Sequence, residues 1–210
     1  MWGLLIFAGL CAVLMFGSVY WARKRRRELD GLARALGLRF APEGLATLAG
    51  ELSEFHLCSS GHNRKVQNCL YGSVQDIEVS VFEYRYDTGG SSPTTYHHAV
   101  ACVRLPANLP AFRLSPTDIF HKIGNLFGYR DINFDTHPVF SRNCHLVGVN
   151  EAAIRKAFTP PVLDFCENQP KLHVEGKGAR LIVYRNGFLK AKDASELLRI
   201  ALHFSELFRE

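Results

Sequence analysis

Several familiar signatures of chemistry are missing from this sequence of 210 residues. It has no Cys-x-x-Cys pair, whereas structural zinc sites usually show two closely spaced ligand pairs. It also has no Gly-x-Ser-x-Gly elbow of a hydrolase and no glycine-rich phosphate loop that opens a helix. Gly176 and Gly178 favour a hairpin turn between strands. The sequence therefore predicts no catalytic residue, no cofactor and no metal site, and it favours a function other than catalysis.

Charge is absent from the first part of the chain. No charged residue lies between Trp2 and Trp21, and no acidic residue comes before Glu28. A helix rises about 1.5 Å per residue, so roughly 20 such residues match the ~30 Å hydrocarbon core of a bilayer. This pattern predicts a transmembrane helix over residues 1–22. Five basic residues then form a juxtamembrane stop over residues 23–27, here called the basic cluster: Arg23, Lys24, Arg25, Arg26 and Arg27.

The position of the basic cluster predicts an orientation for this helix. Basic residues that flank a short apolar segment stay on the cytoplasmic side of a membrane. We therefore expect a single-pass protein of the bacterial inner membrane, with its N-terminus outside and residues 28–210 in the cytoplasm. A cleaved signal peptide would instead carry its positive charge before the apolar run. The expected lipid contacts are anionic headgroups beside the basic cluster, at on the order of 1 kcal/mol per cation.

The rest of the chain carries no excess of charge. The sequence has 25 basic and 20 acidic residues, and subtracting the five residues of the basic cluster leaves 20 of each sign. A nucleic-acid-binding domain would need basic residues gathered on its own surface, so no nucleic-acid partner is predicted. Five cysteines follow the apolar run, at positions 58, 69, 102, 144 and 166. An odd number in apolar surroundings predicts free thiols instead of a disulfide framework.

The apolar pattern after the basic cluster predicts one α+β domain over residues 28–210. A helix continues to Leu36 and ends at Gly37. The clearest strand covers 77–86, where the apolar face changes between Val81 and Phe82 and predicts a bulge or burial on both sides. We expect an antiparallel, meander-rich sheet covered on one face by helices, with a C-terminal helix capped by Asp193 and Glu196. Other strands are expected at 55–59, 66–72, 95–105, 131–134, 139–147, 171–175, 179–184 and 188–190, and other helices at 43–49, 115–127, 150–158 and up to 168.

One acidic loop matches part of a catalytic motif. Asp87–Thr88–Gly89 is the tripeptide of aspartic proteases. Those enzymes need two carboxylates that share one proton, so a single copy would serve only in a symmetric dimer. The flanking Gly90, Ser91 and Ser92 are typical of a flexible hairpin tip, and we favour that interpretation. Asp131, Asn133 and Asp135 could likewise offer oxygen ligands to a hard cation, but a solvated strand face explains them as well.

The histidines also invite two interpretations. His56, Cys58 and His62 are residue types that bind zinc, yet they lack the second ligand pair of a structural site. His97 and His98 lie in a predicted strand, so we expect their rings on opposite faces. Cys102 would lie about 13 Å from His98 along that strand, which excludes a direct catalytic pair. Core or surface histidines are the favoured interpretation.

Several segments carry a resemblance to a known group. The matching segments, after the apolar run and its basic stop, are Ala35–Phe40, Asn68–Gly72, Val81–Tyr86, Leu109–Pro116, Asp131–Phe134 and Pro138–Ser141. With them the chain resembles an uncharacterised family of bacterial single-pass membrane proteins that have a cytoplasmic α+β domain of unknown function. The similarity spans most of the chain, and its motifs are strand and turn signatures. The resemblance therefore implies an architecture and no catalytic residues.

Three functions are compatible with these patterns. The leading hypothesis is a membrane-tethered cytoplasmic binding or scaffold module that binds a protein partner through its sheet or an exposed sheet edge. The second is a hydrolase-like enzyme whose site forms only in three dimensions, with Asp87, His56 and His98 as the first candidates. The third is a sensor of anionic lipid or of the envelope that docks through the basic cluster.

Overall fold

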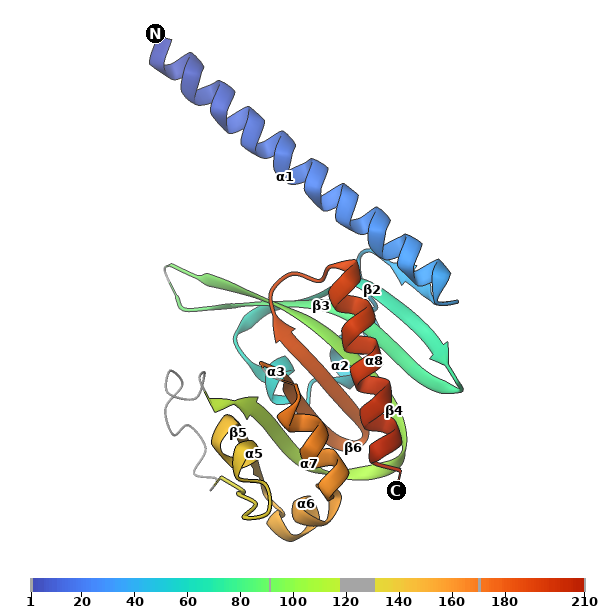
Figure 1. Ribbon diagram of the computed structural model, residues 1–210. Helices are drawn as coiled ribbons and strands as arrows, with labels where there is room; N and C mark the ends of the chain where they lie inside the picture. The colour runs from blue at the N-terminus through green and yellow to red at the C-terminus, as the bar shows by residue number, and fades with distance from the viewer. Residues whose placement is uncertain (1, 91, 118–130, 170, 210) are drawn as a thin grey trace.

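The chain forms a six-stranded antiparallel sheet with helices on both faces, and one long helix extends away from it (Figure 1). The structure is a computed structural model that describes residues 2–90, 92–117, 131–169 and 171–209. The α+β class and the antiparallel sheet predicted from the sequence are confirmed. The strands are β1 (Arg39–Ala41), β2 (His62–Val74), β3 (Ile77–Thr88), β4 (Thr94–Pro116), β5 (Cys144–Gly148) and β6 (His173–Asn186). The helices are α1 (Trp2–Ala35), α2 (Ala46–Glu51), α3 (His56–Ser59), α5 (Pro138–Asn143), α6 (Glu151–Ala157), α7 (Pro160–Glu167) and α8 (Ala191–Leu207).

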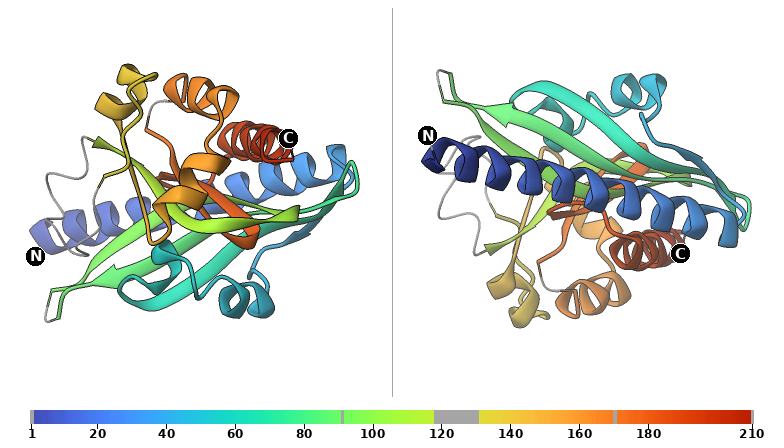
Figure 2. Two further views of the ribbon diagram at one scale, coloured as in Figure 1. Left: turned by 90° about the horizontal axis from the view of Figure 1, so that it is seen from below. Right: turned by 90° about the horizontal axis from the view of Figure 1, so that it is seen from above.

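The sheet is a meander with one late addition. Strands β1 to β5 lie in sequence order, and β6 pairs with β4. Figure 2 shows α6, α7 and α8 on one side of the sheet and α2 and α3 on the other. Helices therefore cover both faces, and the prediction of a single covered face is wrong.

The alternation of β3 explains why the sheet is buried on both sides. Ile77, Val79 and Val81 belong to the larger core, under α1 and α8. Phe82 and Tyr84 point the other way, into a second core that also contains residues of α2 and α3. The change of apolar face in this strand is therefore burial on two faces, as one of the two sequence interpretations predicted.

Strand β4 runs well beyond residue 105, where the predicted strand ends, and passes through Pro106 and Pro110. It pairs with β6 up to Arg104 and again from Leu109, and the register shifts between these positions. A second register shift follows between Leu109 and Phe112, so Pro106 and Pro110 each lie in an irregular part of the pairing. Proline in a sheet is confined to such bulges and to edges. The strand bends here and continues to Pro116, so the helix start predicted at Ser115 is wrong. Thr117 is helical as predicted, and residues 118–127 of that predicted helix lie outside the described residues.

Strand β6 is bent as well. The hydroxyl of Tyr184 donates to a carboxylate oxygen of Glu175 at 2.9 Å, nine residues away in the same strand. Straight extended chain would separate them by about 30 Å. The bend lies at Gly176–Lys177–Gly178, where Gly178 has a φ of +56° that suits glycine. The predicted hairpin turn between two strands is therefore a bend within one strand.

The prediction of a transmembrane helix over residues 1–22 is wrong. Among the residues that the structure describes, no helix combines the length and the apolar character that crossing a bilayer requires. Helix α1 instead runs unbroken through the basic cluster to Ala35, and Leu29 and Ala33 near its end are fully buried in the larger core. The predicted single-pass topology in the bacterial inner membrane, with an external N-terminus, is overturned with it.

Smaller differences have local causes. Residues 56–59 form α3 instead of a strand, and residues 138–143 form α5 ahead of β5. Residues 131–134 are irregular, although the backbone N–H of Ile132 donates to the carbonyl of Leu146. Helix α8 begins before Asp193, with Lys190 at its N-cap and no side-chain cap hydrogen bond. Short apolar runs fit a helix or a strand equally well, and tertiary contacts decide between them.

Close backbone approach at β5 gives a test of the packing. A methyl group on Gly148 would lie 2.4 Å from the carbonyl oxygen of Ala111 and 2.4 Å from Cδ1 of Ile154. Because the first neighbour is backbone, Gly148→Ala is expected to lower the free energy of unfolding by about 1–3 kcal/mol. Gly31→Ala in α1 meets nothing within 4 Å and should be neutral or stabilising by up to about 1 kcal/mol. Urea denaturation of both variants checks this, and equal stability of the two would contradict it.

Candidate functional site

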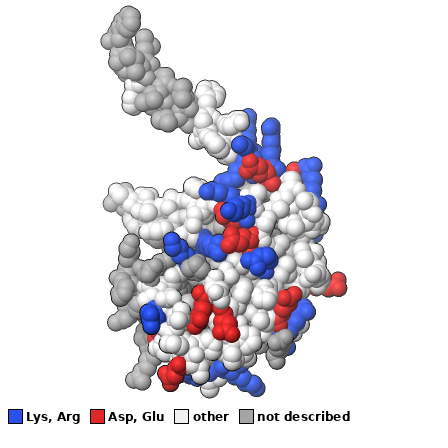
Figure 3. All heavy atoms as spheres, viewed as in Figure 1, with Lys and Arg blue, Asp and Glu red and all other residues white. Residues whose placement is uncertain are grey.

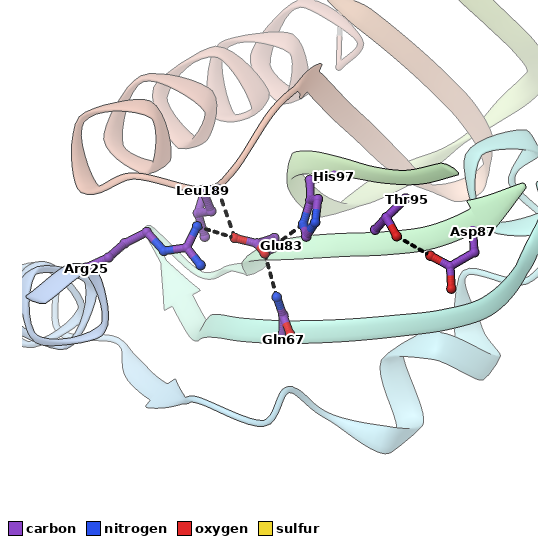
Figure 4. A network of polar contacts seen from close by, with 7 residues as sticks. All are labelled: Arg25, Gln67, Glu83, Asp87, Thr95, His97 and Leu189. Atoms are coloured by element: carbon purple, nitrogen blue, oxygen red, sulfur yellow. Dashed lines mark hydrogen bonds and ion pairs between the residues drawn. The ribbon is translucent and has the colours of Figure 1, made fainter. Parts of the chain in front are cut away.

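The base of α1 is fixed to the domain by a buried carboxylate. Glu83 lies in the middle of β3, and its side chain is completely buried. Its Oε2 accepts from the guanidinium of Arg25 at 2.9 Å and from the backbone N–H of Leu189 at 3.1 Å. Its Oε1 contacts Nε2 of Gln67 at 2.5 Å and Nδ1 of His97 at 3.1 Å. Figure 4 shows how these groups converge on Glu83 from α1, β2, β4 and the turn before α8.

An aromatic ring covers this network. The guanidinium of Arg25 lies 4.9 Å from the ring centroid of Phe188, and the ring of His97 lies 4.1 Å from it. A carboxylate in an apolar interior is costly unless its oxygens are hydrogen-bonded and its charge is paired. Both oxygens of Glu83 meet these conditions. The network therefore fixes α1 to the sheet, and its polar groups pair with one another.

The structure divides the basic cluster between two roles. Arg25 pairs with Glu83, and Arg26 lies 3.3 Å from Glu43. The ammonium group of Lys24 lies 5.2 Å from the centroid of Trp21. Within the described part of the chain, Arg23, Lys24 and Arg27 form no ion pair with an acidic side chain. The cluster thus both anchors the helix and leaves three cations available to a partner. Figure 3 shows Lys and Arg gathered where α1 meets the domain.

Beyond its anchored base, α1 carries large apolar side chains in solvent. Phe16 is 77% exposed, Tyr20 64% and Val19 47%. These three line a shallow hollow on the helix together with Arg23, Lys24 and Arg27. We call these six residues the α1 face. Large exposed apolar groups that cluster in this way mark interaction sites on protein surfaces.

A second polar group lies on the opposite face of the sheet, under α3. The carboxylate of Glu175 accepts from the backbone N–H groups of His56 and Leu57 at 2.6 and 3.1 Å, in addition to the Tyr184 hydroxyl. Burial raises the pKa of Glu175, and these hydrogen bonds oppose that effect. Glu175 therefore satisfies the free amides at the start of α3 and holds this helix on the bent half of β6.

A stack of aromatic rings extends from this point to the surface. The ring of His173 lies 4.7 Å from that of Tyr184 and parallel to it, and His98 meets the same tyrosine edge-on at 5.7 Å. Tyr86 stacks on His98 at 5.5 Å, and Tyr96 stacks on Tyr86 at 5.4 Å. These rings fill one side of the sheet from β6 across to β3. His173, Tyr184 and His98 are buried and have the contacts of a packed core, whereas Tyr96 is exposed.

Burial keeps the histidines of this region neutral. Desolvation lowers the pKa of His98 to about 4, with a smaller effect from His97. It lowers the pKa of His173 to about 4 as well, with help from His98, the Arg113 guanidinium and His56. The pKa of His56 is also lowered to about 4, first by burial and then by Arg113. Neutral imidazoles are therefore part of the native packing.

The three candidates for a hydrolytic site do not form one. Asp87 pairs with Thr95 in the sheet, whereas His98 pairs with Tyr84 three residues away, so their side chains point to opposite faces about 10 Å apart. The carboxylate of Asp87 accepts from Asn63 at 2.6 Å and from Thr95 at 2.7 Å. These hydrogen bonds, led by that of Asn63, lower its pKa. Asp87 thus fixes the base of the β3–β4 hairpin, as the turn interpretation predicted.

The structure also places the paired histidines and the cysteines. His97 and His98 do point to opposite faces, toward Glu83 and toward Tyr86 respectively, which confirms the prediction. The cysteines at positions 58, 69, 102, 144 and 166 are free thiols. Within the described ranges, no group of three or more His, Cys, Asp or Glu side chains is arranged to hold a metal ion. The residue that sequence reasoning missed is Glu83, although an acidic residue in a strand buried on both faces was a usable signal.

Comparison with known proteins gives one informative match. No family model and no curated protein matches the sequence. The fold is similar to that in the crystal structure of the mycobacterial trehalose monomycolate transport factor A, TtfA, with a TM-score of 0.68 and 15% sequence identity. The match covers 89% of this chain and 96% of that one. At this identity the similarity concerns the fold.

Proposed function

We propose that this protein is a non-enzymatic binding module that docks a partner protein through the α1 face. One observation carries the proposal. The C-terminal part of α1 is fixed in the core, whereas side chains nearer its N-terminus are exposed to solvent. Leu29 and Ala33 are fully buried, whereas Phe16 and Tyr20, on the same helix, are more than half exposed. A similar fold in a protein named as a transport factor is compatible with a binding role.

The spacing of the α1 face fits a helix that enters a groove. Phe16, Val19, Tyr20 and Arg23 follow the i, i+3, i+4, i+7 pattern of such helices, and Arg27 continues it. The apolar residues come first along the helix and the cations follow. The complementary partner is a groove with an apolar floor and acidic residues at one end.

The same spacing favours a protein over a lipid surface. A helix that lies in a membrane interface carries its cations on the face opposite the apolar one. Here Arg23 and Arg27 share a face with Phe16 and Tyr20, because positions three, four and seven residues apart lie on one side of a helix. An ordered partner surface can match this arrangement of apolar and charged groups residue by residue.

The anchoring of α1 gives the docking face a fixed direction. Arg25, two residues after Arg23, is held by the buried Glu83. A helix whose base is fixed loses less conformational freedom on binding than a free peptide does, and affinity rises accordingly. Glu83 is in this sense a positioning residue for the α1 face, and it makes no contact with the partner.

In-cell photocrosslinking tests the proposal. A photoreactive phenylalanine analogue placed at Phe16 or at Tyr20 of the full chain should give one discrete protein adduct in the native cells. The same analogue at Ser18, which faces the other side of the helix, is the matched control and should give none. Reversing two cations, Arg23→Glu with Arg27→Glu, should reduce the adduct by about tenfold or more if acidic groups complete the groove.

Each other outcome counts against the proposal. Adducts with lipid alone at positions 16 and 20 would replace the protein partner with a lipid surface. Equal labelling at Ser18 would show that the helix has no preferred face. If the charge reversal leaves the yield of the protein adduct unchanged, acidic groups on the partner do not contribute to binding.

A further inference from the structure

We propose that the groove between the 108–111 segment, α6 and the end of α8 binds a small amphiphile with a single anionic head, of the fatty carboxylate class. The groove has a volume of about 670 Å³ and is open to solvent. Sites for small organic ligands commonly have volumes of ≈ 300–1,000 Å³ and are lined mostly by apolar groups with a few polar ones. This inference is independent of the α1 face.

The floor of the groove is apolar and rigid. It is formed by Leu109, Ala153, Ala157, Leu207 and Phe208. Phe208 contacts Phe112 and Phe158 with ring centroids 6.0 and 5.9 Å apart, and those two rings lie 4.9 Å from each other. Because these neighbours are buried in the larger core, the floor is held in place before any ligand arrives. An alkyl chain would find a preformed apolar surface there.

The rim of the groove is positively charged. Lys156 and Arg209 both line it, and no Asp or Glu is among its described lining residues. Neither cation forms an ion pair with an acidic side chain of the described residues. The polar side chain of Asn150 is already used, because it accepts from the backbone N–H of Ala153 at 3.1 Å. Lys156 and Arg209 are therefore available to form charge-assisted hydrogen bonds with an anionic ligand.

A neighbouring hollow differs from the groove in its acidic residues. It shares Ala111 and Val149 with the groove, and it includes Arg113 and Lys177. It also includes Glu54 and Glu175, and Glu54 lies 3.0 Å from the ammonium group of Lys177. Its cations are thus accompanied by acids, whereas those of the groove are not. An anionic head is favoured at Lys156 and Arg209.

The combination of floor and rim selects the ligand class. A small anion such as acetate would leave the apolar floor in water. A long-chain amine would place its charge beside two like charges. A carboxylate with a chain of about ten carbons satisfies both parts, and each buried methylene adds to affinity.

Binding of decanoate to the purified full-length chain tests the inference. A calorimetric titration with decanoate, kept below its micelle-forming concentration, should show saturable binding with one site per chain. Acetate and decylamine should each bind at least about tenfold more weakly. The double variant Lys156→Glu with Arg209→Glu should lose about tenfold in decanoate affinity, and Ala153→Leu should block the floor. Arg199→Glu, an exposed charge reversal elsewhere on α8, is the control and should bind as the parent does.

Three results would overturn the inference. These are the absence of saturable decanoate binding, equal binding of decanoate and decylamine, and equal affinity of the groove variant and the Arg199→Glu control. Circular dichroism of each variant distinguishes a lost site from a lost fold. Ala153→Leu keeps a good helix former in α6, so it provides a second variant if the charge reversals do not fold.

Discussion

Replacing Glu83 with alanine is expected to lower the free energy of unfolding by about 3–5 kcal/mol, the largest effect of any single substitution proposed here. The substitution leaves the guanidinium of Arg25 without its buried partner and removes an acceptor from Gln67 and from the backbone N–H of Leu189. Of these donors Leu189 is fully buried, whereas Arg25 and Gln67 are half-buried, so each loses its partner in a region with limited access to water. Chemical denaturation at pH 7.5 measures the difference.

A matched control lies on the same strand. Glu78 pairs with Arg104 at 3.6 Å, but both side chains are about 60% exposed. Exposed ion pairs contribute about 0–1 kcal/mol, so Glu78→Ala should have little effect. A double-mutant cycle with Arg25→Met and Glu83→Gln should give a coupling energy of at least about 1 kcal/mol. Additive single effects would show that the two groups act independently, against the account of the anchor.

Acidification is expected to destabilise the protein strongly between about pH 6.5 and pH 4. Burial lowers the pKa of His56, His98 and His173 from the ordinary histidine value of 6.5 to about 4 in the fold. Below pH 6.5 the unfolded chain therefore binds protons that the native state does not, and stability falls as the pH falls. A difference from 6.5 to about 4 corresponds to about 3 kcal/mol for a histidine as buried as His98 or His173, and to less for the more exposed His56. Stability from urea titrations at a series of pH values checks this.

A single variant isolates the contribution of one ring. His173→Phe keeps an aromatic ring against Tyr184 and cannot be protonated. Its stability at pH 8 reports the packing cost of the replacement. Between pH 8 and pH 4, the free energy of unfolding of the variant should fall by about 3 kcal/mol less than that of the parent. An identical pH dependence in the two proteins would show that His173 is not held neutral by burial.

The sequence and the structure agree where the pattern is local and periodic. The alternation of Ile77, Val79 and Val81 with Phe82 and Tyr84 placed β3 and predicted its two buried faces. Gly37, with a φ of +69°, ends α1 as predicted. In both cases the residues involved are neighbours along the chain. Local stereochemistry is then enough to predict the structure.

Prediction failed where distant residues decide the structure. An apolar run followed by cations has the same appearance whether it lies in lipid or extends from a folded domain, and the burial of Leu29 and Ala33 becomes visible only in the fold. The bend of β4 depends on its pairing with β6, about 70 residues later. The pairing of Glu83 with Arg25 joins positions far apart in the chain. None of these contacts has a periodic signature.

Hydrogen exchange of α1 tests most directly whether this helix is part of the folded domain. We expect the backbone amides of residues 25–33 to exchange about as slowly as those of β3 and to open only with global unfolding, because Arg25, Leu29 and Ala33 are held by the domain. Glu83→Ala should speed their exchange more than that of β3. Exchange of residues 25–33 at the rate of an isolated helix, unchanged by the substitution, would contradict the account.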